Sequence, residues 1–247
     1  MKAVFIADSH IKGLDDPNQS SLCRFLDTVE PPDMLVIVGD LFDAWTGFNH
    51  AVFYRYFPLL MSLSRLRERG TEIVYVEGNH DFTMGEFFTG FLGAKVYPDT
   101  CELDLDGKRV LVAHGDTAEK DIWYTLWRGC LRLFIRAISF SPSLVWNIGG
   151  WISRKTRTYS PDRAAAIEGR QRAFARRRIR GGLDGVILAH SHKQAFHREE
   201  TEGKEGFYAN PGAWTAGSMD YLVYEDGEFR LERYRPEEEK TPLKAAR

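Results

Sequence analysis

Acidic, amide and imidazole side chains follow short apolar runs at five separate places in this chain. The motifs are Asp8-Ser9-His10, Gly39-Asp40, Gly78-Asn79-His80-Asp81, His114-Gly115-Asp116 and His190-Ser191-His192. One such pair of polar residues is commonly a solvated turn and carries little information by itself. Here five of the seven histidines lie in the motifs, and only His50 and His197 fall outside them. We expect His50 in a loop and His197 on a strand surface. The joint pattern favours a metal centre over five unrelated turns.

The candidate ligands supply imidazole, carboxylate and amide groups but no thiolate. They are Asp8, His10, Asp40, Asn79, His114, His190 and His192. Such a set suits two divalent cations roughly 3.5 to 4 Å apart, bridged by one carboxylate, with a hydroxide for in-line attack on phosphorus. We expect Asp40 to be the bridge. These ligand types favour Mn²⁺, Fe or Zn²⁺ over a calcium cage, and they do not choose among the three.

Buried strands must hold these motifs at one edge of a sheet. Runs rich in Val, Ile and Tyr predict strands at 3–7, 34–38, 72–76, 110–113 and 185–189. Helical patterns at 20–29 and 51–69 separate the earlier runs, so the chain is of the α/β class. Ligands of open α/β sheets bind outside the carboxyl ends of the strands, where the five motifs should converge. Alternating segments after Ala189 predict a second, more antiparallel sheet from 195–199, 207–210, 221–224 and 229–234.

The composition is that of one globular domain covering 1–247. The chain is 43% hydrophobic and 28% charged with a formal net charge of -2 at pH 7, which excludes disorder, collagen and coiled coil. Its three cysteines have no CxxC spacing, so we expect a reducing compartment and neither a disulfide framework nor a thiolate zinc site. The first apolar run is shorter than a signal-peptide core, and we expect no segment that crosses a bilayer.

A basic, Trp-rich helical insertion at 118–180 departs from this composition. Residues 121–180 contain 13 Lys and Arg, three Asp and Glu, and four of the six tryptophans. Arg128, Arg132 and Arg136 recur every four residues beside an apolar helix body, which is typical of a helix at a membrane interface. We therefore expect an anionic membrane surface as a partner, although a helix packed on its own core would look similar. The run 176–178 is explained by a basic helix end, so we expect no nucleic acid.

In order and spacing, the five motifs resemble those of the calcineurin-like metallophosphoesterases, with the likeness extending over residues 1–215. The resemblance implies a two-sheet α/β sandwich flanked by helices and a metal-dependent hydrolysis of phosphoesters. It also implies two sets of ligands that share one carboxylate. The first metal would be held by Asp8, His10, Asp40 and His192, and the second by Asp40, Asn79, His114 and His190.

A closer similarity is to the UDP-2,3-diacylglucosamine hydrolases of lipid A synthesis. The matching stretches are 39–45, 114–117, 157–160 and 212–214 followed by 217–218, and the insertion at 118–180 stands where those enzymes carry a helical lid. This resemblance implies an acylated nucleotide-sugar substrate, cleaved at its pyrophosphate to UMP and 2,3-diacylglucosamine 1-phosphate. It implies two divalent ions, foremost Mn²⁺, in a cytoplasmic protein held peripherally at the inner membrane with no obligate protein partner. Substrate contacts would come from Asn79, Asp121, Tyr124, Arg157 and Ser160.

His80 departs from this closer family, whose principal members have arginine after the Gly-Asn pair. A sugar-phosphate leaving group is already a stable anion and benefits from the charge of arginine, whereas an alkoxide leaving group needs a proton that histidine can donate. A related subgroup is similar to this chain in having histidine there. We expect His80 and Asp40 to be catalytic. The alternative is another phosphodiesterase or nucleotide pyrophosphatase of the same superfamily. The remote alternative, a lipid- or nucleic-acid-binding module with a vestigial metal site, is disfavoured by the complete ligand set.

Overall fold

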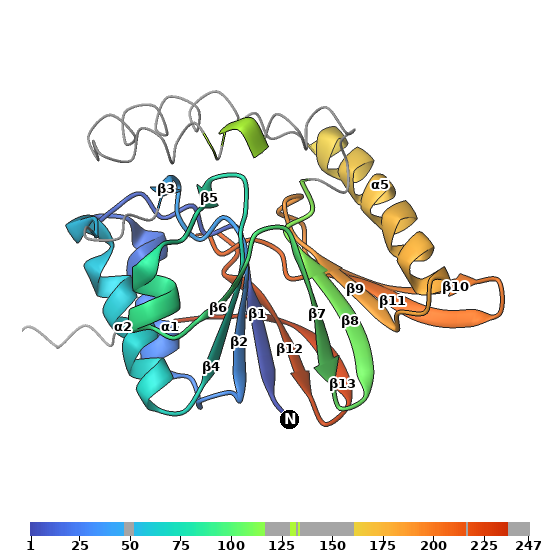
Figure 1. Ribbon diagram of the computed structural model, residues 1–247, viewed down its shortest axis with the longest axis horizontal. Coiled ribbons are helices and arrows are strands. Elements are labelled where there is room, and N and C mark those ends of the chain that lie inside the picture. The colour runs from blue at the N-terminus through green and yellow to red at the C-terminus, as the bar shows by residue number, and fades with distance from the viewer. Residues whose placement is uncertain (47–51, 117–128, 132, 134–160, 216, 237–247) are drawn as a thin grey trace, which may run out of the picture.

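Two β-sheets pack face to face, with helices on the outer face of each (Figure 1). The computed structural model describes residues 1–46, 52–116, 129–131, 133, 161–215 and 217–236. The first sheet has the strand order β13 (Glu228–Arg233), β12 (Asp220–Glu225), β1 (Ala3–Ile6), β2 (Met34–Val38), β4 (Glu72–Val76) and β6 (Lys95–Tyr97). The second sheet has the order β10 (Ala195–Thr201), β11 (Lys204–Asn210), β9 (Gly185–Leu188), β8 (Lys108–Ala113) and β7 (Thr100–Leu105). The two-sheet sandwich flanked by helices is therefore confirmed.

The short strands β3 (Trp45–Thr46) and β5 (Asp81–Phe82) lie above the first sheet in Figure 1. They pair in parallel. The short 3₁₀ helix η1 (Tyr54–Tyr56) leads into helix α2 (Phe57–Glu68), and the short π-helix η2 (Phe87–Phe91) precedes β6. Helix α1 is Pro17–Thr28 and helix α5 is Pro161–Arg180.

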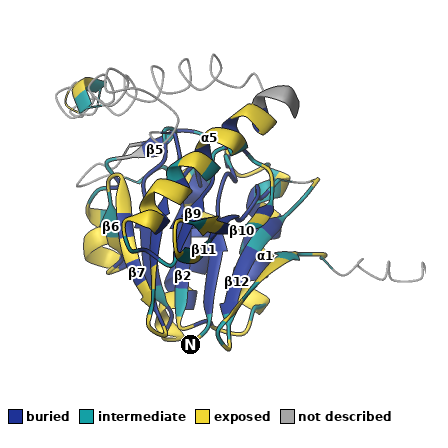
Figure 2. Cartoon of the chain, turned by 90° about the vertical axis from the view of Figure 1, so that its right-hand side faces the viewer, coloured by how far each residue is buried: buried dark blue, intermediate teal, exposed yellow. Residues whose placement is uncertain are grey.

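Successive residues of the central strands enter different layers of the sandwich. In β1, Val4 and Ile6 pack beneath α1 and α2, whereas Phe5 packs between the two sheets. In the second sheet, Leu111 of β8 packs on the α5 side, and its neighbour Val110 lies between the sheets. Because both faces of these strands are buried, their sequences are continuously apolar. Figure 2 shows the buried sheets beneath an exposed outer face of α5.

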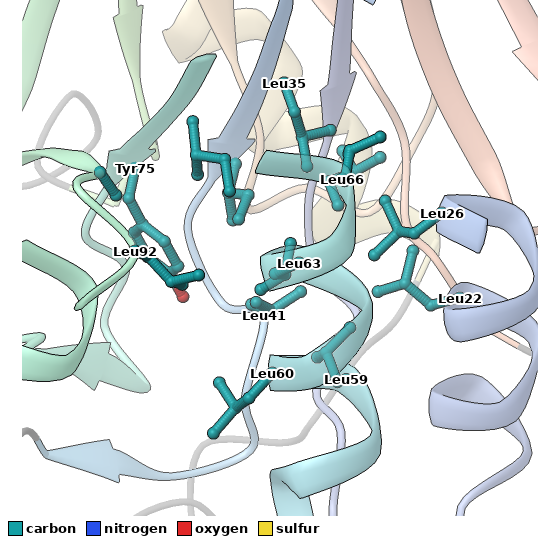
Figure 3. Close-up of a cluster of buried hydrophobic side chains, with 14 of the residues drawn as sticks. Leu22, Leu26, Leu35, Leu41, Leu59, Leu60, Leu63, Leu66, Tyr75 and Leu92 are labelled. Atoms are coloured by element: carbon teal, nitrogen blue, oxygen red, sulfur yellow. The ribbon is translucent and has the colours of Figure 1, made fainter. Parts of the chain in front are cut away.

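The helices of the first sheet begin and end where the sequence carries local signals. The Asp16 carboxylate accepts from the backbone N–H of Asn18 at the start of α1, and Pro17 occupies the first turn. The predicted helix at 51–69 is observed as η1 and α2, and Gly70 follows it with a φ of 100°. Figure 3 shows leucines of α1 and α2 packed together against the first sheet, among them Leu22 and Leu59, both fully buried. Replacing either by alanine should cost about 2–5 kcal/mol.

Two strands expected in the first sheet belong to the second. We expected 110–113 and 185–189 beside 72–76, with a separate antiparallel sheet after Ala189, but β8 and β9 lie at the centre of the second sheet and β12 and β13 extend the first. That assignment was wrong because a continuous apolar run shows that both faces are buried without showing which sheet the strand joins. The motifs still converge, since the carboxyl ends of both sets of parallel strands lie at the same end of the sandwich (Figure 1).

Helix α5 covers the second sheet and is tied to it by ion pairs. Arg172 and Arg176 each place Nε 2.6 Å from the buried carboxylate of Glu199 on β10. Glu168 binds Lys193 at 2.9 Å and the ring of His197 at 2.7 Å. His197 lies on the outer side of strand β10, as expected, and is a partly exposed member of this network. Residues 161–180 of the predicted insertion lie in α5, and its residues 118–128, 132 and 134–160 fall outside the described part of the chain. None of the helices that the structure describes is long and apolar enough to span a membrane.

Candidate metal centre

The backbone is left-handed at five of the predicted ligands. The φ angles are 51° at Asp8, 44° at His10, 53° at Asp40, 67° at His190 and 57° at His192. This conformation is unfavourable for residues with a Cβ, and it persists only where the surrounding structure imposes it. Each of these residues stands at the turn that directly follows a strand end. The backbone is therefore strained at five of the predicted ligands, as is common at functional sites.

The first two turns are held in register by an extension of the β1–β2 pairing. The Asp8 N–H donates to the Gly39 carbonyl at 3.2 Å, and the His10 N–H donates to the Asp40 carbonyl at 3.0 Å. The turn after β9 joins them, because the His190 N–H donates to Oδ2 of Asp8 at 2.9 Å. Turns that are about 180 residues apart in the chain are thus linked directly.

The candidate ligands form overlapping groups around Asp40. Within each group the ligand atoms lie within 4.8 Å of one another. Oδ2 of Asp40 is 3.8 Å from Nε2 of His10 and 3.3 Å from Nε2 of His114, so this carboxylate lies between two clusters of imidazoles. The groups are Asp8 with His10 and His192, Asp40 with His114 and His190, and His10 with Asp40 and His80.

Close approaches between ring nitrogens indicate that these groups fit cations. Nε2 of His10 lies 3.2 Å from Nε2 of His192, and Nε2 of His114 lies 3.2 Å from Nδ1 of His190. Oδ1 of Asp8 is buried and, within the described residues, accepts no hydrogen bond. A buried carboxylate oxygen without a partner is costly, and a divalent cation would satisfy it together with the imidazole lone pairs. The donor set of nitrogen and oxygen therefore suits divalent metal binding.

Hydrogen bonds fix the ring of His114 for this role. Its Nδ1 lies 2.9 Å from the carbonyl oxygen of Val38, which can only accept, so Nδ1 carries the proton. Nε2, which lies 3.3 Å from Oδ1 of Asn79, is then the nitrogen that would face a cation once it has lost its own proton. A hydrogen bond donated by the ring nitrogen that does not face the metal orients a metal-binding histidine and raises the basicity of the other nitrogen.

The charges of the cluster perturb its titration. Burial raises the pKa of Asp8, and the neighbouring His192 and His114 only partly offset this. Burial also acts on Asp40, but there His114, His80 and His10 outweigh it and hold the pKa well below its usual range. Burial opposes protonation of His114, yet Asp40 raises its pKa to about 10. A cation bound at Nε2 would displace that proton, so metal binding should release protons.

His80 is held beside Asp40 by two contacts. Its backbone N–H donates to Oδ1 of Asp40 at 2.9 Å, and its ring Nδ1 donates to the Asp43 carbonyl at 2.9 Å. The ring meets that of His10 edge to face, with centroids 4.8 Å apart. Because Nδ1 is committed to a carbonyl, proton exchange with a substrate would fall to Nε2.

Sequence reasoning assigned no role to Asp81, which organises two of the turns. Its carboxylate accepts from the N–H groups of Asp40 at 2.9 Å, Gly78 at 3.0 Å and Phe42 at 3.2 Å, and from the hydroxyl of Tyr75 at 2.5 Å. Burial and the charge of Asp40 raise the pKa of Asp81 to about 7. The available signal was its place in the Gly-Asn-His-Asp motif, but sequence alone could not show that it points away from the cluster's ligands.

Glycine at position 78 allows the turn after β4 to approach the Asp40 turn. A Cβ at this position would lie 2.0 Å from Oδ1 of Asp40 and 2.5 Å from its backbone nitrogen. No side chain fits there without displacing Asp40.

The structure thus brings together the seven predicted ligands and His80, whereas Asp121, Tyr124, Arg157 and Ser160 lie outside the described residues.

Comparison with known proteins gives one family and a consistent set of relatives. The family model for calcineurin-like phosphoesterases matches residues 1–194. A UDP-2,3-diacylglucosamine hydrolase of Stenotrophomonas maltophilia is 30% identical over 227 residues, which cover 83% of this chain and 87% of that protein. Proteins with the same description from Aeromonas salmonicida and Escherichia coli are 29% and 27% identical and cover 94% and 93% of this chain, and 93% and 98% of their own lengths.

Proposed function

The chain belongs to the calcineurin-like phosphoesterase family, and on this premise we propose that it hydrolyses the pyrophosphate of UDP-2,3-diacylglucosamine to UMP and 2,3-diacylglucosamine 1-phosphate. The observation that carries the proposal is the similarity to UDP-2,3-diacylglucosamine hydrolases along nearly the full length of the chain. The convergence of the histidines and aspartates at one edge of the sandwich supports it, because hydrolysis at phosphorus needs concentrated positive charge.

Seven residues would hold two divalent cations, which we take to be Mn²⁺. Asp40 would contribute to both sites, because its carboxylate faces imidazoles on either side. Two such cations supply Lewis-acid stabilisation of charge on a phosphoryl group and lower the pKa of water. One site would use Asp8, His10, Asp40 and His192, and the other Asp40, Asn79, His114 and His190.

The protein's own groups would orient the substrate and handle protons. His80 stands beside Asp40 with Nδ1 bound to a carbonyl, so its Nε2 would contact the phosphoryl oxygens or the leaving group. The sugar 1-phosphate leaves as a stable anion and needs charge stabilisation more than a proton. Asn79, Asp121, Tyr124, Arg157 and Ser160 would contact the phosphosugar.

A second candidate function is hydrolysis of a different phosphodiester or nucleotide pyrophosphate. The observation in its favour is histidine at position 80, since an imidazole can protonate an alkoxide leaving group. The metal site would be the same, and only the substrate would differ.

The test is turnover of UDP-2,3-diacylglucosamine by the metal-loaded full chain, followed by ³¹P NMR. The expected products are UMP and a sugar 1-phosphate, formed only with divalent metal. UDP-N-acetylglucosamine, which lacks the long acyl chains, is the matched control substrate and should react far more slowly. Turnover of bis-p-nitrophenyl phosphate without release of UMP from the acylated substrate would instead favour the second candidate.

An acylated substrate resides in a membrane, so we propose that the protein binds an anionic bilayer at the cytoplasmic face of the inner membrane. The basic, Trp-rich composition of residues 121–180 supports this. Serine at both Trp127 and Trp151 should reduce sedimentation with anionic vesicles and slow hydrolysis of the acylated substrate. Turnover of bis-p-nitrophenyl phosphate should stay near the parent rate, and equal loss on both substrates with a lower Tm would assign these tryptophans to the protein core.

A further inference from the structure

The turn that carries His190 has an unusual backbone. The Ser191 N–H donates to the carbonyl oxygen of Ala189, two residues earlier, at 2.8 Å, and His190 between them has a φ of 67°. An i to i+2 bond around a residue with positive φ is the rare and strained kind of γ-turn. Without contacts from the rest of the protein, these residues would adopt a less strained backbone conformation. A turn of this kind therefore needs support from its surroundings.

That support comes from two side chains, Gln171 on α5 and Asn210 at the end of β11. Nε2 of Gln171, on α5, donates to the Ala189 carbonyl at 2.8 Å, and Nδ2 of Asn210 donates to it at 3.2 Å. Both amides are fully buried. One carbonyl oxygen thus receives three donors, and two of them come from side chains that fix the position of the turn.

The amide of Gln171 is itself held in one orientation. The hydroxyl of Tyr208 donates to Oε1 of Gln171 at 2.8 Å, and the Ala189 carbonyl can only accept, so Nε2 faces the turn. Gln171 also lies against the turn after β8, since a Cβ at Gly115 would be 2.6 Å from its Nε2. It therefore lies between the two turns that carry His114 and His190.

We propose that Gln171 is a positioning residue of the metal centre, which holds His190 in the conformation that presents Nδ1 to the cation shared with Asp40 and His114. The proposal rests on the metal role assigned above to His190, and it does not depend on which phosphoester is the substrate. It also makes α5, the helix directly after the insertion, part of the machinery that sets metal affinity. Groups that orient ligands commonly change metal affinity by about 10- to 100-fold.

The test is Mn²⁺ binding to the metal-stripped full chain, measured by calorimetry and by electron paramagnetic resonance without substrate. Gln171→Met keeps the length of the side chain and removes the hydrogen bonds with Ala189 and Tyr208, and it should weaken one of the two Mn²⁺ sites about 10- to 100-fold. Tyr208→Phe removes the bond that orients the amide and keeps the bond from Gln171 to Ala189, so its effect should have the same sign and be smaller. This second variant keeps the test open if Gln171→Met does not fold, as judged by circular dichroism.

The matched control is Arg172→Met, the next residue on the same helix. Arg172 binds Glu199 and not the Ala189 carbonyl, so its replacement should lower the Tm and leave both Mn²⁺ affinities unchanged. A His190→Ala background separates positioning from general support, because two changes that act through one ligand are not additive. There, Gln171→Met should cause no further loss of affinity. Wild-type Mn²⁺ affinity in Gln171→Met, or equal loss in Arg172→Met or in the His190→Ala background, would overturn the proposal. Failure of UMP release alone would leave it standing.

Discussion

Replacing Gly78 by alanine should disable the proposed metal centre, because the added methyl group collides with the carboxylate of Asp40, the proposed bridge. The new Cβ would lie 2.0 Å from Oδ1 of Asp40 and 2.5 Å from its backbone nitrogen, whereas real Cβ contacts stay beyond 3.0 Å. Asp40 or the turn after β4 must therefore move by about 1 Å. A displacement of that size at a catalytic group can reduce the rate about 100-fold.

The strain should also be visible in the stability of the metal-free protein. Overpacking of a buried contact costs about 1–3 kcal/mol, which for a chain of this size corresponds to a drop in Tm of roughly 2–12 °C. Mn²⁺ affinity should fall about 10- to 100-fold. The measurements are thermal unfolding in chelator, Mn²⁺ titration and turnover of bis-p-nitrophenyl phosphate.

Gly169→Ala is the matched control for Gly78→Ala. Gly169 is exposed on α5, and a Cβ there would meet nothing within 4 Å. Alanine at a helical position of this kind should stabilise the protein by about 0.5–1 kcal/mol and leave activity and metal binding intact. Full activity and wild-type Mn²⁺ affinity in Gly78→Ala would refute the reasoning, because they would mean that the bridging position of Asp40 is not needed.

Three further predictions concern charge and protonation. Asp40→Asn should abolish turnover and lower the content of both metals, as measured by mass spectrometry, because the bridging oxygen loses its negative charge; a fully active variant with two metals would contradict this. His80→Ala should slow the hydrolysis of alkyl phosphodiesters more than that of p-nitrophenyl esters, whose anions leave without a proton, and equal losses would show that His80 does not donate one. Glu199→Gln should destabilise the protein by about 1–3 kcal/mol at pH 7. Burial opposes ionisation of Glu199, but Arg172 and Arg176 lower its pKa overall, so its contribution is complete above the ordinary glutamate value. The difference in unfolding free energy should therefore shrink as the pH falls through the lowered pKa, and a constant difference down to pH 3 would argue against the ion pairs.

The candidate metal centre could be predicted because five motifs of Asp, Asn and His each stand at the end of a predicted strand. Asp8, His10 and Asp40 follow apolar runs directly, and geometry then requires the carboxyl ends of parallel strands to meet. The seven candidates were therefore available without any structure. The sheet to which β8 and β9 belong could not be predicted, because buried strands of either sheet have the same apolar pattern.

The supporting residues could not be found from sequence because their signal is purely spatial. Asp81 differs from a ligand only in the direction of its carboxylate, which turns toward backbone N–H groups. Gln171 is one of many polar residues on a charged helix, and its burial against Ala189 depends on how α5 packs on the second sheet. Neither property follows from periodicity or spacing.

In the proposed metal centre, five turns hold two divalent cations with Asp40 between them. The most direct measurement is anomalous X-ray diffraction from crystals grown with Mn²⁺, recorded at the manganese edge. We predict two peaks, one coordinated by Asp8, His10 and His192 and the other by Asn79, His114 and His190, with the Asp40 carboxylate contacting both. A single peak, or peaks away from these residues, would contradict this proposal.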